Sequence, residues 1–131
     1  MTDVATNERD AGAGDDLPAF VQAETTPVEV AGEGLKRQLL GYGPAIMGAH
    51  AWFETGAVGQ MHAHHHAQIA YVVSGRFAVT VGEETRTLVA GDSFYVAPNV
   101  MHGAVCEEAG ELIDVFSPWR EDFLGREEGA Y

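Results

Sequence analysis

From residue 35 onward the chain consists of short apolar or alternating segments that are separated by turn residues. Such segments are typical of β-strands, because successive side chains on a strand face opposite sides. Strands are expected at Leu35–Leu40, Ala45–Glu54, Ala67–Val73, Phe77–Val81, Thr85–Val89, Ser93–Val96, His102–Cys106 and Glu111–Phe116. Residues 82–84, between two alternating runs, predict a hairpin. About eight closely spaced strands in roughly a hundred residues predict an all-β domain, either a sandwich or a jelly-roll β-barrel.

The beginning of the chain differs from this region. Residues 1–24 are rich in Asp, Gly, Ala and Thr, show little periodicity, and are expected to form a flexible acidic tail. Residues 25–131 are expected to form one domain, because 131 residues leave room for a single core. Helical periodicity is expected at most in the last segment, from Arg120 onward.

The formal net charge of −13 limits the classes of partner. It repels phosphate backbones, and the seven Lys and Arg residues form no basic stripe, so no nucleic-acid partner is expected. The acidity fits either ordinary solubility or a high-salt habitat. A single cysteine, Cys106, suits a reducing compartment, and neither a secretory signal nor a membrane-spanning apolar run is found. A cytoplasmic protein without a membrane partner is therefore expected.

Four residues have the side chains and the spacing of a metal site. His62 and His64 stand two apart, which puts both imidazoles on one face of a strand, and His102 follows a turn at Pro98. With the amide of Gln68 they predict one bound divalent metal ion that keeps one or two coordination positions open, as a catalytic site requires. Two alternatives remain at this point: His66 could replace Gln68 as a ligand, and the run of three histidines from His64 could be a solvated surface.

Two groups of residues resemble the paired motifs of the cupin superfamily: Gly56, His62, His64, Gln68 and Gly75, and then Gly91, Pro98 and His102. The resemblance covers residues 35–118 and implies a single-domain jelly-roll β-barrel, but it does not specify an activity. Most metal-binding cupins carry a glutamate where this chain has Gln68. A neutral ligand raises the charge of the site by one unit, which favours polarisation of a substrate over activation of oxygen.

The segment from Glu111 to Leu124 resembles the C-terminal signature of the KdgF-type cupins, which open the ring of 4,5-unsaturated monouronates. The resemblance implies that Asp114 shuttles a proton, Phe116 packs against the sugar ring and Arg120 orients the substrate carboxylate. The residues themselves fit these roles, since arginine grips a carboxylate in bidentate fashion. Alternation on this segment does not decide whether Asp114 points inward, and Arg120 could instead pair with an acidic neighbour at 121 or 122.

The function expected from these residues is a metal-dependent, isomerase-like ring opening of an anionic sugar. Zn²⁺ or Ni²⁺ is the expected ion, and Fe²⁺ and Mn²⁺ would also accept such a site. The polymer that supplies the sugar, pectin or alginate, stays open, as does the interface of an expected homodimer. The alternatives are a cupin dioxygenase, which would consume O₂, and a cupin that binds sugar acids without turnover.

Overall fold

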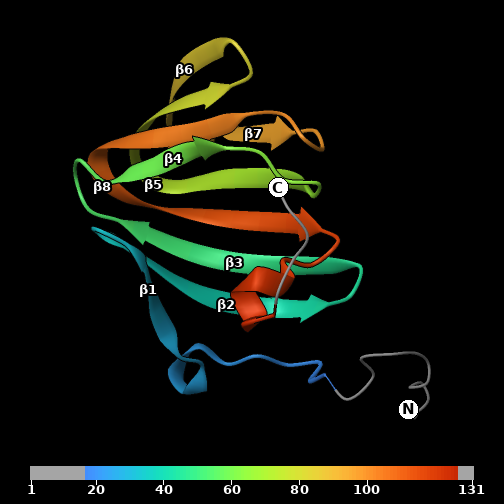
Figure 1. The fold of residues 1–131 in the computed structure, drawn as a ribbon. Helices are drawn as coiled ribbons and strands as arrows, with labels where there is room; N and C mark the ends of the chain where they lie inside the picture. The colour runs from blue at the N-terminus through green and yellow to red at the C-terminus, as the bar shows by residue number, and fades with distance from the viewer. Residues whose placement is uncertain (1–16, 127–131) are drawn as a thin grey trace.

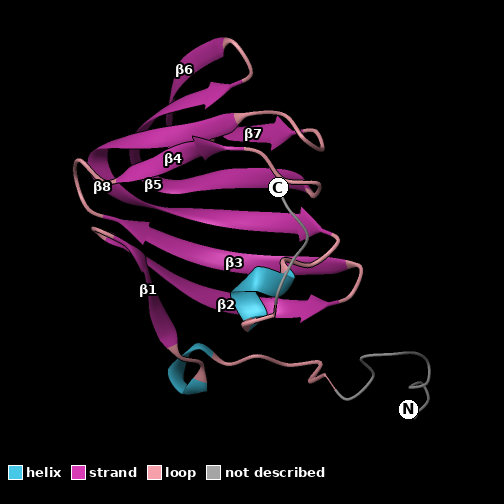
Figure 2. Ribbon diagram, in the orientation of Figure 1, coloured by secondary structure: helices cyan, strands magenta, loops and turns pink. Residues whose placement is uncertain are grey.

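Eight β-strands and two short 3-10 helices make up residues 17–126, the part of the chain that the computed structural model describes (Figure 1). The strands are β1 (Val28–Gly32), β2 (Leu35–Gly43), β3 (Ile46–Phe53), β4 (Val58–His62), β5 (Ala67–Val81), β6 (Glu84–Val89), β7 (Ser93–Val96) and β8 (His102–Ser117). The helices are η2 (Ala23–Thr25) and η3 (Glu121–Leu124). Strands dominate and helices are confined to a few residues (Figure 2), which confirms the predicted all-β class.

All strands belong to one antiparallel sheet with the order β1-β2-β3-β8-β5-β6, to which β4 adds on β8 and β7 adds on β5. The two longest strands, β5 and β8, pair with each other along their whole length and change their outer partners halfway. The first half of β8 pairs with β4 and its second half with β3. A sheet whose central strands change partners in this way curls over on itself, as a jelly-roll barrel requires.

The observed strands differ from the predicted ones in two respects. Val28–Gly32 and Val58–His62 form strands that the sequence did not predict, and two predicted breaks do not end a strand. Ala67–Val81 is one strand of 15 residues and His102–Ser117 is one strand of 16, although each was predicted as two. The hairpin predicted at 82–84 is confirmed, because β5 and β6 pair directly on either side of it.

Glycines at the bends of β5 and β8 explain why these breaks do not end the strands. Gly75 has φ +87°, and a Cβ on it would lie 2.6 Å from the Glu108 carbonyl oxygen and from the Gly110 Cα. A Cβ on Gly110 would collide with the carbonyl of Ser74. The register between the strands shifts at this point, as in a β-bulge. The two glycines let both strands bend together without losing their pairing.

Replacing Gly75 with alanine is therefore expected to destabilise the fold by about 2–4 kcal/mol, from the left-handed φ together with the collision. Gly56 is the matched control, because it also has a positive φ, +89°, but no atom lies within 4 Å of its added Cβ. Gly56→Ala should cost only about 1 kcal/mol. Urea unfolding of both variants measures the difference, and equal losses would contradict the role assigned to the bend.

The interior of the barrel combines an apolar floor with an open end. Phe53 and Phe77 pack edge to face with ring centroids 5.1 Å apart, and Cys106 is buried beside them. Ala51 lines the open part, where a small side chain leaves space. Residues 23–26 are attached to the barrel by Gln38, whose amide donates to the carbonyls of Ala23 and Thr26, both at 2.9 Å.

The predicted tail, 1–24, lies mostly outside the described residues, and its boundary with the domain stays a prediction. Within residues 17–126 no helix is long and apolar enough to cross a membrane.

Candidate metal centre and its cavity

Three imidazoles converge at one end of the barrel. His62 ends β4, His102 begins β8 and is its cross-strand partner, and His64 lies in the loop that leads to β5. Their ring centroids are 4.4–5.3 Å apart, and one nitrogen from each lies within 4.8 Å of the others. His64 and His102 are buried, and His62 is the most accessible of the three. These three side chains could hold a metal ion.

Backbone carbonyls fix the orientation of each ring. The Nδ1 of His62 lies 2.7 Å from the carbonyl oxygen of Gln60. The Nδ1 of His64 lies 3.1 Å from that of His66, and the Nδ1 of His102 lies 2.9 Å from that of Val100. An Nδ1–H that donates to a carbonyl leaves Nε2 as the lone-pair nitrogen, which is the usual arrangement of metal-binding histidines. The Nε2 of His102 is buried and has no hydrogen-bond partner among the described residues. A metal ion would satisfy this nitrogen, so the residues present fit a metal.

The way in which His62 and His64 come together differs from the prediction. The sequence predicted that both project from one strand face, and this is wrong, because β4 ends at His62. His64 is held by its loop instead: its carbonyl accepts a hydrogen bond of 2.7 Å from the backbone N–H of Asn99. Asn99 has φ +68°, and it lies in the turn that precedes His102. One turn therefore helps to place two of the three imidazoles.

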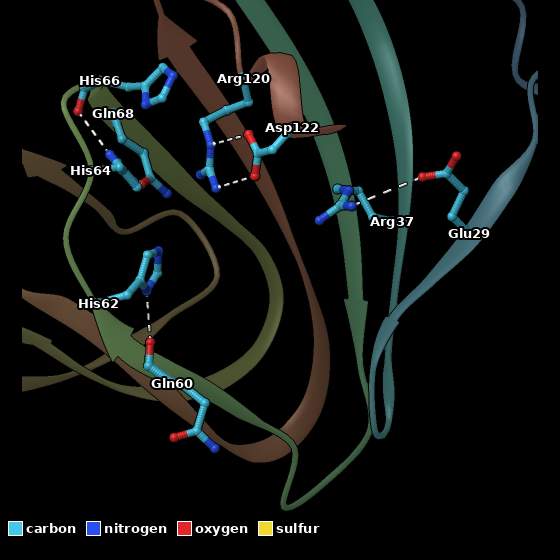
Figure 3. A network of polar contacts seen from close by, with 9 residues as sticks. All are labelled: Glu29, Arg37, Gln60, His62, His64, His66, Gln68, Arg120 and Asp122. Carbon is cyan, nitrogen blue, oxygen red and sulfur yellow. Dashed lines mark hydrogen bonds and ion pairs between the residues drawn. The ribbon is translucent and has the colours of Figure 1, made fainter. Parts of the chain in front are cut away.

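Gln68, from β5, lies beside the three histidines with its amide oriented by a neighbour. Its Nε2 donates to Asp114 Oδ1 at 2.9 Å, and its Oε1 lies 3.1 Å from His64 Nε2. The carboxylate can only accept, so it sets the amide with its oxygen toward the histidines. His66 lies on the other side of Gln68 from His62 (Figure 3) and packs on the ring of His65, with a centroid distance of 3.9 Å. The converging nitrogens are those of His62, His64 and His102 and do not include His66, so the amide oxygen of Gln68 is the fourth candidate ligand.

A cavity of about 200 Å³ opens beside the histidines and is lined by Asp114, Phe116 and Arg120. Asp114 therefore faces inward, which alternation on β8 did not decide. Loss of solvent around the carboxyl raises the pKa of Asp114 to about 6, although the bond from Gln68 and the charges of Arg120 and Arg37 oppose the shift. A carboxyl with such a pKa can both accept and release a proton near neutral pH.

Arg120 is buried, and it pairs with one of the two acidic neighbours that the sequence left open. Its Nε and Nη2 donate to the two carboxylate oxygens of Asp122 at 3.1 and 3.0 Å (Figure 3). The guanidinium also faces the rings of Phe116 and Phe123, with distances of 5.1 and 4.4 Å to the centroids. The short helix η3 supplies Asp122 and Phe123, so it closes this side of the cavity.

Burial favours the neutral forms of His64 and His102. Desolvation, followed by the charge of Arg120, lowers the pKa of His64 to about 4. Desolvation also lowers the pKa of His102. Metal ligation needs an unprotonated imidazole, so both rings are ready to bind a metal ion at neutral pH.

The lowered pKa of His64 and the raised pKa of Asp114 lead to a prediction for the metal-free protein. His64 binds its proton more weakly when folded, so its contribution to stability falls as the pH drops from 6.5 to about 4. Asp114 binds its proton more tightly when folded, so its ionisation costs stability above about pH 6 and this cost vanishes toward pH 4. Metal-free Asp114→Asn should be more stable than wild type at pH 7, on the order of 2 kcal/mol, with the gain disappearing near pH 4.

Urea unfolding after treatment with a chelator, at several pH values, measures this gain. An equal gain at pH 7 and pH 4 would mean that the Asp114 carboxyl is not perturbed in the folded protein.

The lining residues that were not predicted for the site include Arg37 on β2 and Phe123 on η3, which contact each other. A signal for Arg37 was present, because it stands two residues after Leu35 on the same strand and both line the cavity. Phe123 lies within the segment from Glu111 to Leu124 that resembles the signature, but only the fold shows that η3 turns back over the barrel (Figure 1).

Comparisons with known proteins agree with this architecture. The family model Cupin_2, described as "Cupin domain", matches residues 50–116. The pectin degradation protein KdgF of Dickeya dadantii (strain 3937) is 44% identical over 107 residues, which cover 80% of this chain and 96% of that protein. Two solved structures superpose with TM-scores of 0.79 and 0.77: an RmlC-like cupin from Shewanella frigidimarina NCIMB 400, 52% identical, and KdgF from Halomonas sp., 37% identical. Each alignment covers 81% of this chain and at least 96% of the other.

Proposed function

Because the chain belongs to the cupin family, in which the fold alone does not define an activity, we propose its function from the cavity: a metal-dependent opening of the ring of 4,5-unsaturated monouronates. One observation carries the proposal. The carboxyl of Asp114 lies in the cavity and is joined through Gln68 to a cluster of three histidines. A proton-transferring group thus stands next to a site for a Lewis acid. The similarity to the pectin degradation protein KdgF supports a uronate as the substrate.

The reaction needs a proton to move and no electrons to leave the substrate. An unsaturated monouronate has a hydroxyl at C1 and an enol ether formed by the ring oxygen, C5 and C4. Loss of the hydroxyl proton makes a C1 aldehyde and breaks the bond from C1 to the ring oxygen. The ring oxygen becomes a ketone on C5, and C4 gains a proton. The product is the open-chain 5-keto-4-deoxyuronate.

Asp114 is the proposed proton carrier. Its pKa of about 6 lets the carboxylate take the hydroxyl proton and the resulting acid deliver a proton to C4. The hydrogen bond from Gln68 holds one oxygen, so the other is the one expected to face the substrate. A divalent ion held by His62, His64, Gln68 and His102 would supply polarisation of substrate oxygens.

Arg120 and Phe116 are proposed to position the sugar. The guanidinium of Arg120 orients the substrate carboxylate, and Asp122 holds this guanidinium in place by accepting two hydrogen bonds from it. The ring of Phe116 forms an apolar wall beside Asp114. A cavity of about 200 Å³ has room for one sugar ring, which agrees with a monosaccharide substrate that is released before this reaction.

The test is incubation of the purified protein with freshly released 4,5-unsaturated galacturonate, and in parallel with its counterpart from alginate. Faster loss of the ultraviolet absorbance of the double bond than in buffer alone supports the proposal, and the preferred sugar indicates the source polymer. Chelation should abolish the acceleration, and addition of Zn²⁺, Ni²⁺, Fe²⁺ or Mn²⁺ should identify the active ion. O₂ consumption would favour a dioxygenase, and uronate binding without a change in absorbance would favour a binding protein.

A homodimer in the cytoplasm is the proposed working form. On the outer face of the barrel, Ile69, Tyr71 and Val73 alternate along β5, and Tyr95 on β7 is the cross-strand partner of Ile69. All four are at least 40% exposed, which makes this apolar face the proposed contact between two copies. Light scattering of the wild type and of Ile69→Glu measures the mass. A monomeric wild type would contradict the proposal.

A further inference from the structure

Two guanidinium groups, not one, face the cavity. Arg37 extends from β2 and lines the same space as Arg120 and Asp114. Its Cζ lies 3.7 Å from the centroid of the Phe123 ring, which Arg120 also faces at 4.4 Å. Phe123 therefore positions both cations. In the view of Figure 3, Arg37 lies between the pair formed by Arg120 and Asp122 and the carboxylate of Glu29.

The hydrogen-bonding needs of Arg37 are only partly met. Its Nη2 lies 4.0 Å from Glu29, and the side chain of Glu29 is 53% exposed, so this pair is weak. Its Nε is buried and has no hydrogen-bond partner among the described residues. A buried donor without an acceptor costs free energy, and an incoming anion would recover that cost.

Arg120 stands in contrast to Arg37. Its Nε and Nη2, the edge of the guanidinium that best matches a carboxylate, already hold both oxygens of Asp122. Among the residues that the structure describes, none forms such a bidentate pair with Arg37. Desolvation is the main cause of the lowered pKa of Arg37, and the charge of Arg120 adds to it, against the opposing charges of Glu29, Asp122 and Asp114. The two cations therefore lie near enough to repel each other. An anion between them would relieve this repulsion.

We propose that Arg37 is a specificity-determining residue that binds the substrate carboxylate together with Arg120 and so selects sugar acids over neutral sugars. This inference rests on the proposed function for the identity of its ligand. A protein with a net charge of −13 repels an anionic substrate, and two cations beside a metal site supply local attraction.

Arg37→Met is the main variant, because methionine keeps an unbranched apolar stem over Phe123 and removes the charge and the donors. Arg37→Lys is the second variant, and it keeps the charge without the planar fork. Arg76→Gln is the matched control, because it lowers the net charge by the same unit. Arg76 lies outside the cavity, where it pairs with Glu107 and Glu108.

Two measurements are made on the metal-loaded protein. In the ring-opening assay, Arg37→Met should raise KM by about 10- to 100-fold with kcat changed much less, as expected for the loss of a charge-assisted hydrogen bond. In calorimetry, its binding of D-galacturonate should weaken by a similar factor, whereas the weak binding of D-galactose should not change. Arg37→Lys should fall between wild type and Arg37→Met, and Arg76→Gln should match wild type.

The two measurements separate the inference from the proposed function. If ring opening proceeds with an unchanged KM in Arg37→Met, the inference is wrong and the function stands. If the wild type opens no unsaturated uronate but Arg37→Met loses the preference for galacturonate over galactose, the function is wrong and the inference stands. Equal weakening in Arg76→Gln would assign the effect to net charge and overturn the inference. If Arg37→Met does not fold, Arg37→Lys decides, since full wild-type KM and affinity in that variant would contradict a role for the fork.

Discussion

Asp114→Asn is expected to slow ring opening by about 10²–10⁴-fold, the usual contribution of a positioned acid or base. Asparagine keeps the shape of the side chain and can still accept the hydrogen bond from Gln68. It cannot carry a proton. The loss should therefore appear in kcat, because the substrate still finds the same cavity, and it should persist across the pH range in which wild type is active.

Two controls separate this loss from indirect effects. Elemental analysis should find the same metal content in wild type and Asp114→Asn, because the asparagine oxygen can still accept from Gln68 Nε2 and the three imidazoles are unchanged. Asp122→Asn removes the carboxylate that holds Arg120 at 3.0 Å and leaves the proton carrier in place. That variant should raise KM more than it lowers kcat. Unchanged turnover in Asp114→Asn with full metal content would rule out Asp114 as the proton carrier.

The fold class was predictable because side chains along the strands of the barrel alternate between the interior and the surface, as β3 illustrates. Its residues alternate between buried and accessible from Met47 to Phe53, so its period of two is visible in the sequence. β1 was missed because Val28 and Val30 lie at the edge of the sheet and are both exposed. β4 was missed because none of its five residues is buried, so no alternation marks it, and its last residue is the candidate ligand His62. Local patterns do not reveal strands that pair at an edge or carry functional side chains.

The candidate site was partly predictable for a similar reason. His62, His64, Gln68 and His102 are close in sequence or follow a turn signal, and the structure brings all four together. Arg37 lies more than twenty residues before the first of them, and its place in the cavity depends on the pairing of β2 with β3 and on η3. The sequence did not predict whether Arg120 pairs with Asp122. Residue spacing alone does not show whether an arginine lines a pocket or forms an ion pair on the surface.

His64→Ala is expected to empty the metal site and to reduce ring opening by about 10³-fold or more, since a Lewis acid contributes several kcal/mol to such a reaction. His64 is the imidazole of the cluster that lies beside Gln68. Its ring lies within 5.3 Å of both His62 and His102, and its Nε2 lies beside the Gln68 oxygen. Loss of this side chain leaves two imidazoles and one amide, which is too weak a set to retain a divalent ion through dialysis.

His65→Ala is the matched control, because it changes the same residue type at the next position of the same loop. His65 is exposed and does not belong to the group of three histidines whose nitrogens converge. This variant should keep its metal and its rate. Elemental analysis after dialysis and the ultraviolet assay together decide the matter, because a metal site made of chance surface histidines would lose affinity to a similar extent in both variants. Full metal content in His64→Ala would place the ion elsewhere and remove the basis of the proposed mechanism.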